Sequence, residues 1–320
     1  MTRWWVDEQR DVVLHDGPDT TVWLVRDPGP GVRSGDLPAI VVKEVRGGPR
    51  ADRVRAANHA LADVDHPDLL PVLGQWDYDG PGGDPGVVVA LPFAAGGTLR
   101  RRLEERGTLS PGETVAVLSP VVAALDHLGR NGLIHGDLKP ENVLLWADGR
   151  PVVADVSGDT PFATVGYAAP EMFDGVSGPP AARDVFSLGV VAYEVLTGRH
   201  PHPGTPSETV AAARAGVHRP LSMWSSIPGP VAAAVEDAIE PRPERRTPDV
   251  VTFLDALADS VPQATVVWPG PAASAVVGPT APWTTIEITG APPPPAVPEA
   301  GRTRLRSWPT RRRSQSRRCP

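Results

Sequence analysis

Residues Ile134 to Leu145 read I-H-G-D-L-K-P-E-N-V-L-L. This stretch holds Lys139, one of only two lysines among the 31 basic residues of the chain. Asp137, Lys139 and Asn142 lie between a helix-favouring segment and the apolar run V-L-L, which predicts one loop leading into a short strand. A carboxylate that accepts a hydroxyl proton, a lysine that balances phosphoryl charge and an amide that helps to hold magnesium are what phosphoryl transfer needs. Lysine supplies a compact point charge that the planar arginine fork does not reproduce, which explains its retention here.

The composition predicts a globular body and a separate basic tail. The chain has 320 residues, 41% of them apolar, and a formal charge of −7. From Pro262 onward, however, eight arginines stand against Glu287 and Glu299, so the body is acidic and the end is basic. An acidic body argues against specific nucleic-acid binding, which needs clustered Lys and Arg.

The ends of the chain and its single cysteine bear on its setting. Cys319 excludes an intrachain disulfide and a cysteine-based zinc site. The N-terminal stretch has no apolar run of signal-peptide length, and no window resembles a transmembrane span. We therefore expect a soluble, cytoplasmic protein with no transmembrane segment.

Apolar patterns predict a small β-rich lobe followed by a helical one. Strands are expected over residues 12–15, 21–25, 39–45 and 86–91, with one Ala-rich helix over 51–64. Ser110 and Glu113 form a capping box that opens a helix to about Arg130, and Pro120 should kink it. Further helices are expected near residues 183–197, 207–215, 229–239 and 248–259. Beyond Val261 the chain is rich in Pro and Ala and then in Arg, which predicts a disordered tail.

H-G-D-L-K-P-E-N resembles the catalytic loop of the eukaryotic-type protein kinase family, and D-L-K-P-E-N in particular resembles its Ser/Thr class. Other motifs follow in the family's order. The run A-I-V-V-K ends at Lys43 and resembles the V-A-I-K strand, and D-V-S at Asp155 is similar to D-F-G. A-T-V-G-Y-A-A-P-E, D-V-F-S-L-G and R-P-E-R-R-T resemble the end of the activation segment, the central helix and its arginine. Both lysines of the chain thus fall on positions where the family uses a lysine.

The resemblance implies an α+β, bilobal protein-kinase-like fold that binds ATP and Mg²⁺. It implies a kinase-like domain over residues 1–261, with an N-lobe over 1–94 and a C-lobe over 95–261, and leaves 262–320 as the tail. Asp137 and Lys139 are the implied catalytic residues, and Asn142 and Asp155 the metal ligands. The other implied nucleotide-binding residues are Lys43, Gly17, Val22, Leu91, Pro92 and Ala94. Ala94 follows Phe93 in the implied hinge and would offer its N–H to adenine, while Pro92 keeps only a carbonyl acceptor.

Four further positions have roles implied by the resemblance. Asp184 would brace the backbone of the catalytic loop, and Arg246 would pair with Glu171 of A-P-E. Thr164 corresponds to the threonine of the substrate loop.

Four positions depart from the family pattern. The Gly-rich loop reads H-D-G-P-D-T-T-V and keeps only Gly17 of three glycines, and Ala57 stands where the helix glutamate partner of Lys43 belongs. Gly136 replaces the arginine that would bind a phosphorylated activation loop, and Ser157 replaces the glycine of D-F-G, with Gly158 one place late. We therefore expect no switching by activation-loop phosphorylation.

These departures leave three functions open. The first is an ATP-dependent protein Ser/Thr kinase of low or unusual activity, and the second is a pseudokinase that binds nucleotide or acts as a scaffold. The third is a small-molecule phosphotransferase, because H-G-D also resembles the catalytic loop of the aminoglycoside phosphotransferase family. The protein substrate stays unknown, and the basic tail suits an acidic partner or an anionic surface.

Overall fold

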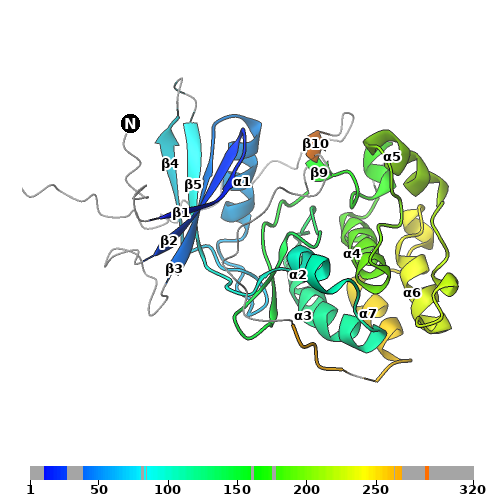
Figure 1. Ribbon diagram of the computed structural model, residues 1–320. Coiled ribbons are helices and arrows are strands. Elements are labelled where there is room, and N and C mark those ends of the chain that lie inside the picture. The colour runs from blue at the N-terminus through cyan, green and yellow to red at the C-terminus, as the bar shows by residue number, and fades with distance from the viewer. Residues whose placement is uncertain are drawn as a thin grey trace, which may run out of the picture.

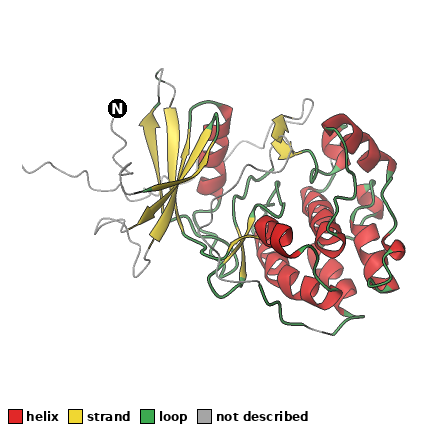
Figure 2. Ribbon diagram, in the orientation of Figure 1, coloured by secondary structure: helices red, strands yellow, loops and turns green. Residues whose placement is uncertain are grey.

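The expected two-lobed α+β architecture is confirmed, with a β-sheet lobe and a helical lobe side by side (Figures 1 and 2). The computed structural model describes residues 11–26, 39–80, 83, 85–159, 162–174, 178–262, 264–268 and 285–287. Most of the basic tail, with Cys319, lies outside the described residues, so its predicted disorder stays a prediction. Among the described helices, none is long and apolar enough to cross a lipid bilayer.

The N-lobe is an antiparallel sheet of five strands in the order β1-β2-β3-β5-β4, with helix α1 against it. The elements are β1 (Val12–Asp16), β2 (Thr20–Arg26), β3 (Ala39–Val45), α1 (Pro49–Ala60), β4 (Gly74–Asp79) and β5 (Pro85–Pro92). The sequence predicted all of them except β4, which reads G-Q-W-D-Y-D. This strand pairs only with β5 at the edge of the sheet, where polar residues can face solvent. Its sequence therefore lacks the apolar alternation by which a strand is predicted.

Alternation along the strands gives the N-lobe two apolar faces. On one face, Val87 and Val89 pack with Val45 and with Ala51 of α1. On the other face lie the side chains of Trp23, Val25, Ile40, Val42, Val88 and Ala90. Because Lys43 is two residues before Val45, it belongs to the face that α1 covers.

The C-lobe is built from helices joined by short segments. Its helices are α2 (Leu99–Arg106), α3 (Pro111–Arg130), α4 (Pro180–Thr197), α5 (Pro206–Ala215), α6 (Gly229–Ala238) and α7 (Val250–Ala258), with short 3₁₀ turns η1 (Pro170–Phe173), η2 (Leu221–Met223) and η3 (Pro243–Arg245). The predicted capping box is present, because the Glu113 carboxylate accepts the Ser110 N–H at 2.9 Å. Pro120 lies inside α3, which runs from Pro111 to Arg130, and the predicted kink there stays a prediction.

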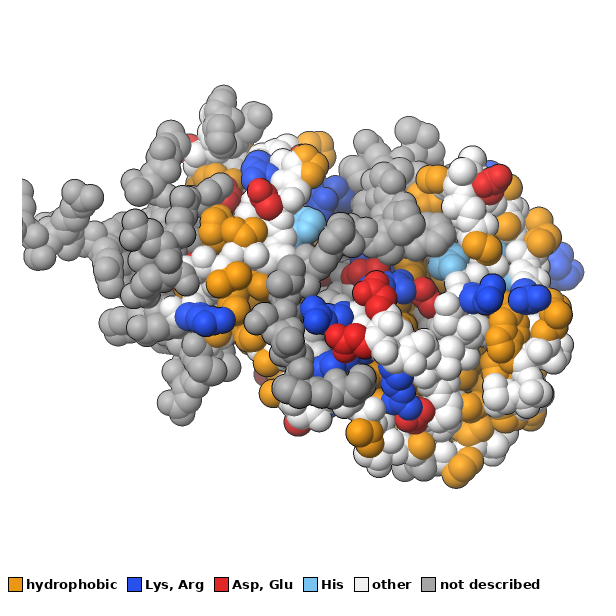
Figure 3. Space-filling view, viewed as in Figure 1, with side chains coloured by type: hydrophobic (Ala, Val, Ile, Leu, Met, Phe, Trp, Pro, Cys, Tyr) orange, Lys and Arg blue, Asp and Glu red, His pale blue; other side chains and the backbone are white. Residues whose placement is uncertain are grey.

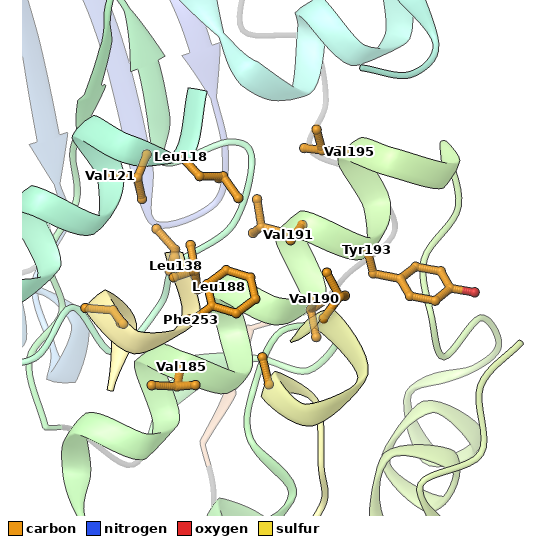
Figure 4. Close-up of a cluster of buried hydrophobic side chains, with 14 of the residues drawn as sticks. Leu118, Val121, Leu138, Val185, Leu188, Val190, Val191, Tyr193, Val195 and Phe253 are labelled. Carbon is orange, nitrogen blue, oxygen red and sulfur yellow. The ribbon is translucent and has the colours of Figure 1, made fainter. Parts of the chain in front are cut away.

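Helix α4 is the centre of the C-lobe core. Every residue from Asp184 to Thr197 is buried, which is expected of a helix that other elements surround. Figure 4 shows Val185, Leu188 and Val191 of α4 beside Leu118 of α3 and Phe253 of α7. This helix therefore provides a fixed support for the loops that reach it.

Short strands carry the loops between the lobes. Strands β6 (Gly97–Thr98), β7 (Val143–Leu145) and β8 (Pro151–Val153) form a three-stranded sheet, and β9 (Phe162–Thr164) pairs with β10 (Thr285–Glu287). The catalytic loop enters β7, and Asp155 follows β8 by two residues.

Residues 264–268, which composition assigned to the tail, are packed against the C-lobe. Val266 and Trp268 contact its apolar core, and the Trp268 indole N–H donates to the Gly149 carbonyl at 3.2 Å. Packing of the chain therefore continues past Val261.

Candidate active site

Asp184 at the start of α4 shapes the catalytic loop. Its carboxylate is buried and accepts the backbone N–H groups of His135 at 2.7 Å and Gly136 at 3.0 Å. Burial raises the pKa of Asp184, and these two N–H groups act against that rise. The expected bracing contact is thus present.

His135 joins the same loop to the end of β8. Its Nδ1 accepts the Asp137 N–H at 3.2 Å, which leaves Nε2 to donate to the Ala154 carbonyl at 3.0 Å. Since Ala154 precedes Asp155, this contact fixes the catalytic loop relative to the expected metal ligand.

The Asp137 carboxylate is oriented from both sides. Its Oδ1 accepts the Thr164 N–H at 2.9 Å, and its Oδ2 lies 2.7 Å from the Lys139 ammonium. Lys139 also donates to the Thr164 hydroxyl at 2.6 Å, and Asn142 donates to the Asp137 carbonyl at 2.8 Å. A carboxylate offers about four lone-pair sites, so Asp137 keeps capacity for a further proton donor.

Lys43 pairs with Asp155, at a distance of 112 residues along the chain. Asp155 has φ of 61°, a strained conformation for a residue other than glycine and one that clusters at functional sites. The half-buried carboxylate of Asp155 loses part of its hydration, which opposes ionisation, but the Lys43 ammonium outweighs this effect. With a smaller contribution from Lys139, it holds the pKa of Asp155 well below its usual range. Asp155 is therefore a carboxylate at neutral pH and within electrostatic reach of the catalytic loop.

The acidic and amide side chains of α1 serve other partners. Asp52 pairs with Arg55 at 2.6 Å, and Asn58 donates to Gln75 at 2.7 Å. Glu44 alternates with Lys43 along β3 and accepts the Tyr78 hydroxyl at 2.9 Å on the other face of the sheet. Asp155 is thus the anion that contacts Lys43, a partner that the sequence did not indicate.

Strand register places three of the expected nucleotide residues on one face of the sheet. Val22 lies opposite Lys43, and Leu91 lies opposite Val41, two residues from Lys43 on the same face. Pro92 ends β5, and the Ala94 carbonyl accepts the Gly97 N–H at 3.2 Å. The expected adenine contacts of Pro92 and Ala94 stay predictions.

The expected phosphate loop is a tight turn between β1 and β2. Gly17 donates to the Thr20 carbonyl at 2.8 Å, and Arg46 reaches back to the carbonyls of Gly17 at 2.5 Å and Pro18 at 2.7 Å. A second guanidinium nitrogen of Arg46 donates to the Thr21 hydroxyl at 2.8 Å. Arg46 thus fastens a turn that has lost two of the three glycines.

The sequence did not reveal the partners of Arg100 at the start of α2. Its guanidinium donates to Glu141 at 2.8 Å, to Glu194 at 2.7 and 3.1 Å, and to the Tyr167 hydroxyl at 2.5 Å. Burial opposes the charge of Arg100, yet Glu194 outweighs it and raises the pKa of Arg100 above its usual value. One cation therefore ties α2, the catalytic loop, the activation segment and α4 together, and no motif in the sequence marks it.

The end of the activation segment is held by an ion pair that the sequence did predict. Arg246 donates to the two oxygens of Glu171 at 2.9 and 3.0 Å, and both side chains are buried. Arg246 also lies over the Phe186 ring at 5.0 Å from its centroid.

The residues present fit Mg²⁺ and ATP. Half of the Asp155 side chain is exposed (50%). The side-chain amide of Asn142 donates an N–H to the Asp137 carbonyl, so its side-chain oxygen can be offered to a cation. Proteins hold magnesium with one or two such ligands and use substrate phosphates for the rest. Among the described residues, no group of three or more His, Cys, Asp or Glu side chains is arranged to hold a metal. Figure 3 shows charged side chains of both signs gathered where the lobes meet.

Comparison with known proteins identifies the family to which the chain belongs. The family described as "Protein kinase domain" matches residues 39–264, so the turn between β1 and β2 lies outside the match. The serine/threonine-protein kinase PknL of Mycobacterium tuberculosis (strain ATCC 25618 / H37Rv) is 34% identical over 227 residues, covering 65% of this chain and 55% of PknL. PknJ of the same strain is 30% identical over 273 residues, covering 77% of this chain and 44% of PknJ.

A more distant relative is the probable serine/threonine-protein kinase PknB of Lactococcus lactis, which is 26% identical over 164 residues, or 48% of this chain and 25% of PknB. The chain spans about half the length of the curated relatives PknL and PknJ. The match over residues 39–264 covers most of the sequence, and the chain belongs to the protein kinase domain family.

Proposed function

We propose that this chain is a protein serine/threonine kinase that transfers the γ-phosphate of ATP to a protein hydroxyl. The observation that carries the proposal is the convergence on Asp137 of Lys139, Asn142 and Thr164. The names of the relatives support serine and threonine as acceptors. The need for ATP supports a cytoplasmic site of action.

Asp137 is the proposed proton acceptor. Because Thr164 and Lys139 each hold one of its oxygens, the carboxylate is fixed before a substrate arrives, which lowers the cost of orientation. Lys139 offers a cation beside the attacked phosphoryl group, where negative charge is spread in the transition state.

Lys43, Asp155 and Asn142 are the proposed residues for ATP and Mg²⁺, with Val22, Leu91, Pro92 and Ala94 around the base. When bound, the nucleotide supplies the phosphoryl group and the metal neutralises its charge. Lys43 is pre-oriented by Asp155 in place of a helix glutamate. The tight turn at Gly17 supports low or unusual activity, because it brings fewer flexible glycines to the phosphates.

A pseudokinase is the second candidate, and the turn between β1 and β2 favours it. Arg46 donates to the carbonyls of Gly17 and Pro18, and this fastened turn keeps only one of the three glycines that would let the backbone approach phosphate. In this case the kinase fold would serve as a nucleotide-binding or scaffolding module. The arginine-rich tail would support docking to an acidic partner or an anionic surface in either case.

Transfer of labelled γ-phosphate from ATP to a generic basic protein tests the proposal. Asp137→Asn should lower kcat by about 10²- to 10⁴-fold, the usual loss of a general base. Asp126→Asn is the matched control, because Asp126 pairs with Arg130 at 2.7 Å on α3, away from the site. Equal labelling by wild type and Asp137→Asn would sink the kinase assignment, and labelling of aminoglycosides but of no protein would favour a small-molecule phosphotransferase.

A thermal-shift titration with ATP and Mg²⁺ separates the two candidates further. A ligand at a hundred times its Kd stabilises the folded state by about 2.7 kcal/mol, and Lys43→Met should abolish the corresponding shift. A nucleotide-induced shift without phosphate transfer would establish the pseudokinase. No shift at millimolar nucleotide would leave only the scaffold.

A further inference from the structure

The first residues of the activation loop cross the catalytic loop at two glycines. The N–H groups of Ser157 and Gly158 both donate to the His135 carbonyl, at 2.8 and 3.1 Å. Gly136 has φ of 76° and Gly158 has φ of 73°. A Cβ atom on Gly136 would lie 2.2 Å from the Gly158 carbonyl oxygen, which no side chain tolerates. Glycine at position 136, in place of arginine, and glycine at position 158 are therefore both explained by this close backbone crossing.

The next residue of the loop, Asp159, forms an ion pair with Arg183. Its carboxylate lies 2.5 Å from the Arg183 guanidinium, whose side chain is only 11% exposed, whereas that of Asp159 is 43% exposed. A charge-assisted hydrogen bond with a mostly buried arginine is among the stronger contacts available to a loop. Asp159 thus anchors the loop to the first turns of α4.

Arg183 directly precedes Asp184, which holds the catalytic loop through His135 and Gly136. Adjacent residues of one buried helix therefore fasten both loops: Arg183 holds the activation loop and Asp184 holds the catalytic loop. Farther along, Thr164 contacts Asp137, and the Tyr167 carbonyl accepts the Ser187 hydroxyl of α4 at 2.8 Å. The same helix holds the segment on both sides of Thr164.

We propose that Asp159 is a built-in anion that, through Arg183, keeps the activation loop where Thr164 can orient Asp137. The pair acts as a positioning pair for the loop, and it supplies by sequence the negative charge that a phosphorylated loop would supply by modification. This inference rests on the proposed kinase function. It explains how a chain without an arginine at 136 still holds its activation loop.

The experiment uses the full chain after treatment with a protein phosphatase. Asp159→Asn removes the charge and keeps the shape, and Asp126→Asn makes the same change in the ion pair with Arg130 on α3. Asp159→Glu keeps the carboxylate and serves as the conservative rescue. For each protein we would measure kcat and KM toward a generic basic protein, the ATP-induced thermal shift, and hydrogen exchange of residues 156–168.

Treated wild type should keep its full rate, and Asp159→Asn should lose roughly tenfold to a hundredfold in kcat/KM for the protein substrate. Its ATP-induced shift should not change, its exchange over residues 156–168 should become faster, and Asp126→Asn and Asp159→Glu should resemble wild type. Full activity of Asp159→Asn, or loss of activity when wild type is dephosphorylated, would overturn the proposal. If wild type transfers no phosphate, the proposed kinase function is wrong. Hydrogen exchange of residues 156–168 then tests the inference by itself, and unchanged exchange in Asp159→Asn overturns it.

Discussion

Replacing Gly136 tests the crossing of the two loops directly. In Gly136→Ala, a residue with a side chain must keep φ near 76°, which costs about 1–2 kcal/mol. The new Cβ would also lie 2.2 Å from the Gly158 oxygen and 3.1 Å from its carbonyl carbon, both backbone atoms that cannot turn aside. Residues 157 and 158 must then move and lose their two hydrogen bonds to His135, at about 1 kcal/mol each. We expect a total loss of about 3–4 kcal/mol in the free energy of unfolding, measured by urea denaturation.

Two other glycines separate these contributions. Gly158→Ala should cost only the backbone term of about 1–2 kcal/mol, because φ is 73° there but no atom lies within 4 Å of the added Cβ. Gly129→Ala in α3 also meets no atom within 4 Å and should stabilise the chain by about 0.5–1 kcal/mol, since alanine favours a helix. Equal losses in Gly136→Ala and Gly158→Ala would refute the tight crossing. Gly136→Arg introduces the arginine of the family pattern but meets the same contact with Gly158. It should therefore lower kinase activity, and a gain in activity would count against the tight crossing.

Two further predictions concern buried charges. Burial, with help from His200 and His218, lowers the pKa of His202 to about 3, so the unfolded chain binds its proton first and stability falls as pH drops below about 6.5. The loss between pH 7 and pH 5 should be about 2 kcal/mol, and urea denaturation at both pH values should show it in wild type and find it reduced by that amount in His202→Leu. Arg246→Met leaves the buried Glu171 without its cation and should cost about 3–5 kcal/mol in thermal unfolding. Adding Glu171→Met should recover much of that loss, and no recovery would contradict the ion-pair explanation.

The catalytic loop could be predicted from the sequence because its residues are neighbours in the chain. Asp137, Lys139 and Asn142 fall on one loop, so local spacing alone brings them together. The pair of Glu171 and Arg246 was predictable for another reason, since each belongs to a motif with a known order. Helices α1 and α3 to α7 were also predicted to within a few residues, because their apolar period and caps are local features, whereas the short α2 was not predicted.

Contacts between distant segments could not be predicted in this way. The partner of Lys43 lies 112 residues away, and its carboxylate is aimed by the φ of Asp155, which no composition or period reveals. Strand β4 was missed because an edge strand needs little apolar alternation. The packing of Trp268 on the C-lobe was hidden by a Pro-rich neighbourhood that is typical of tails.

The cluster around Arg100 has a consequence for the history of the sequence. Its guanidinium is the shared counterion of Glu141 and Glu194, and all three side chains are at most 15% exposed. Loss of the arginine alone would leave two largely buried carboxylates without their cation. Loss of one carboxylate would remove a partner of the arginine at a site where little solvent can replace it. Substitutions at these positions should therefore be inherited together, so that in a set of close homologues position 100 covaries with positions 141 and 194. None of the three residues has a proposed catalytic role, yet we expect their positions to be substituted together rather than one at a time.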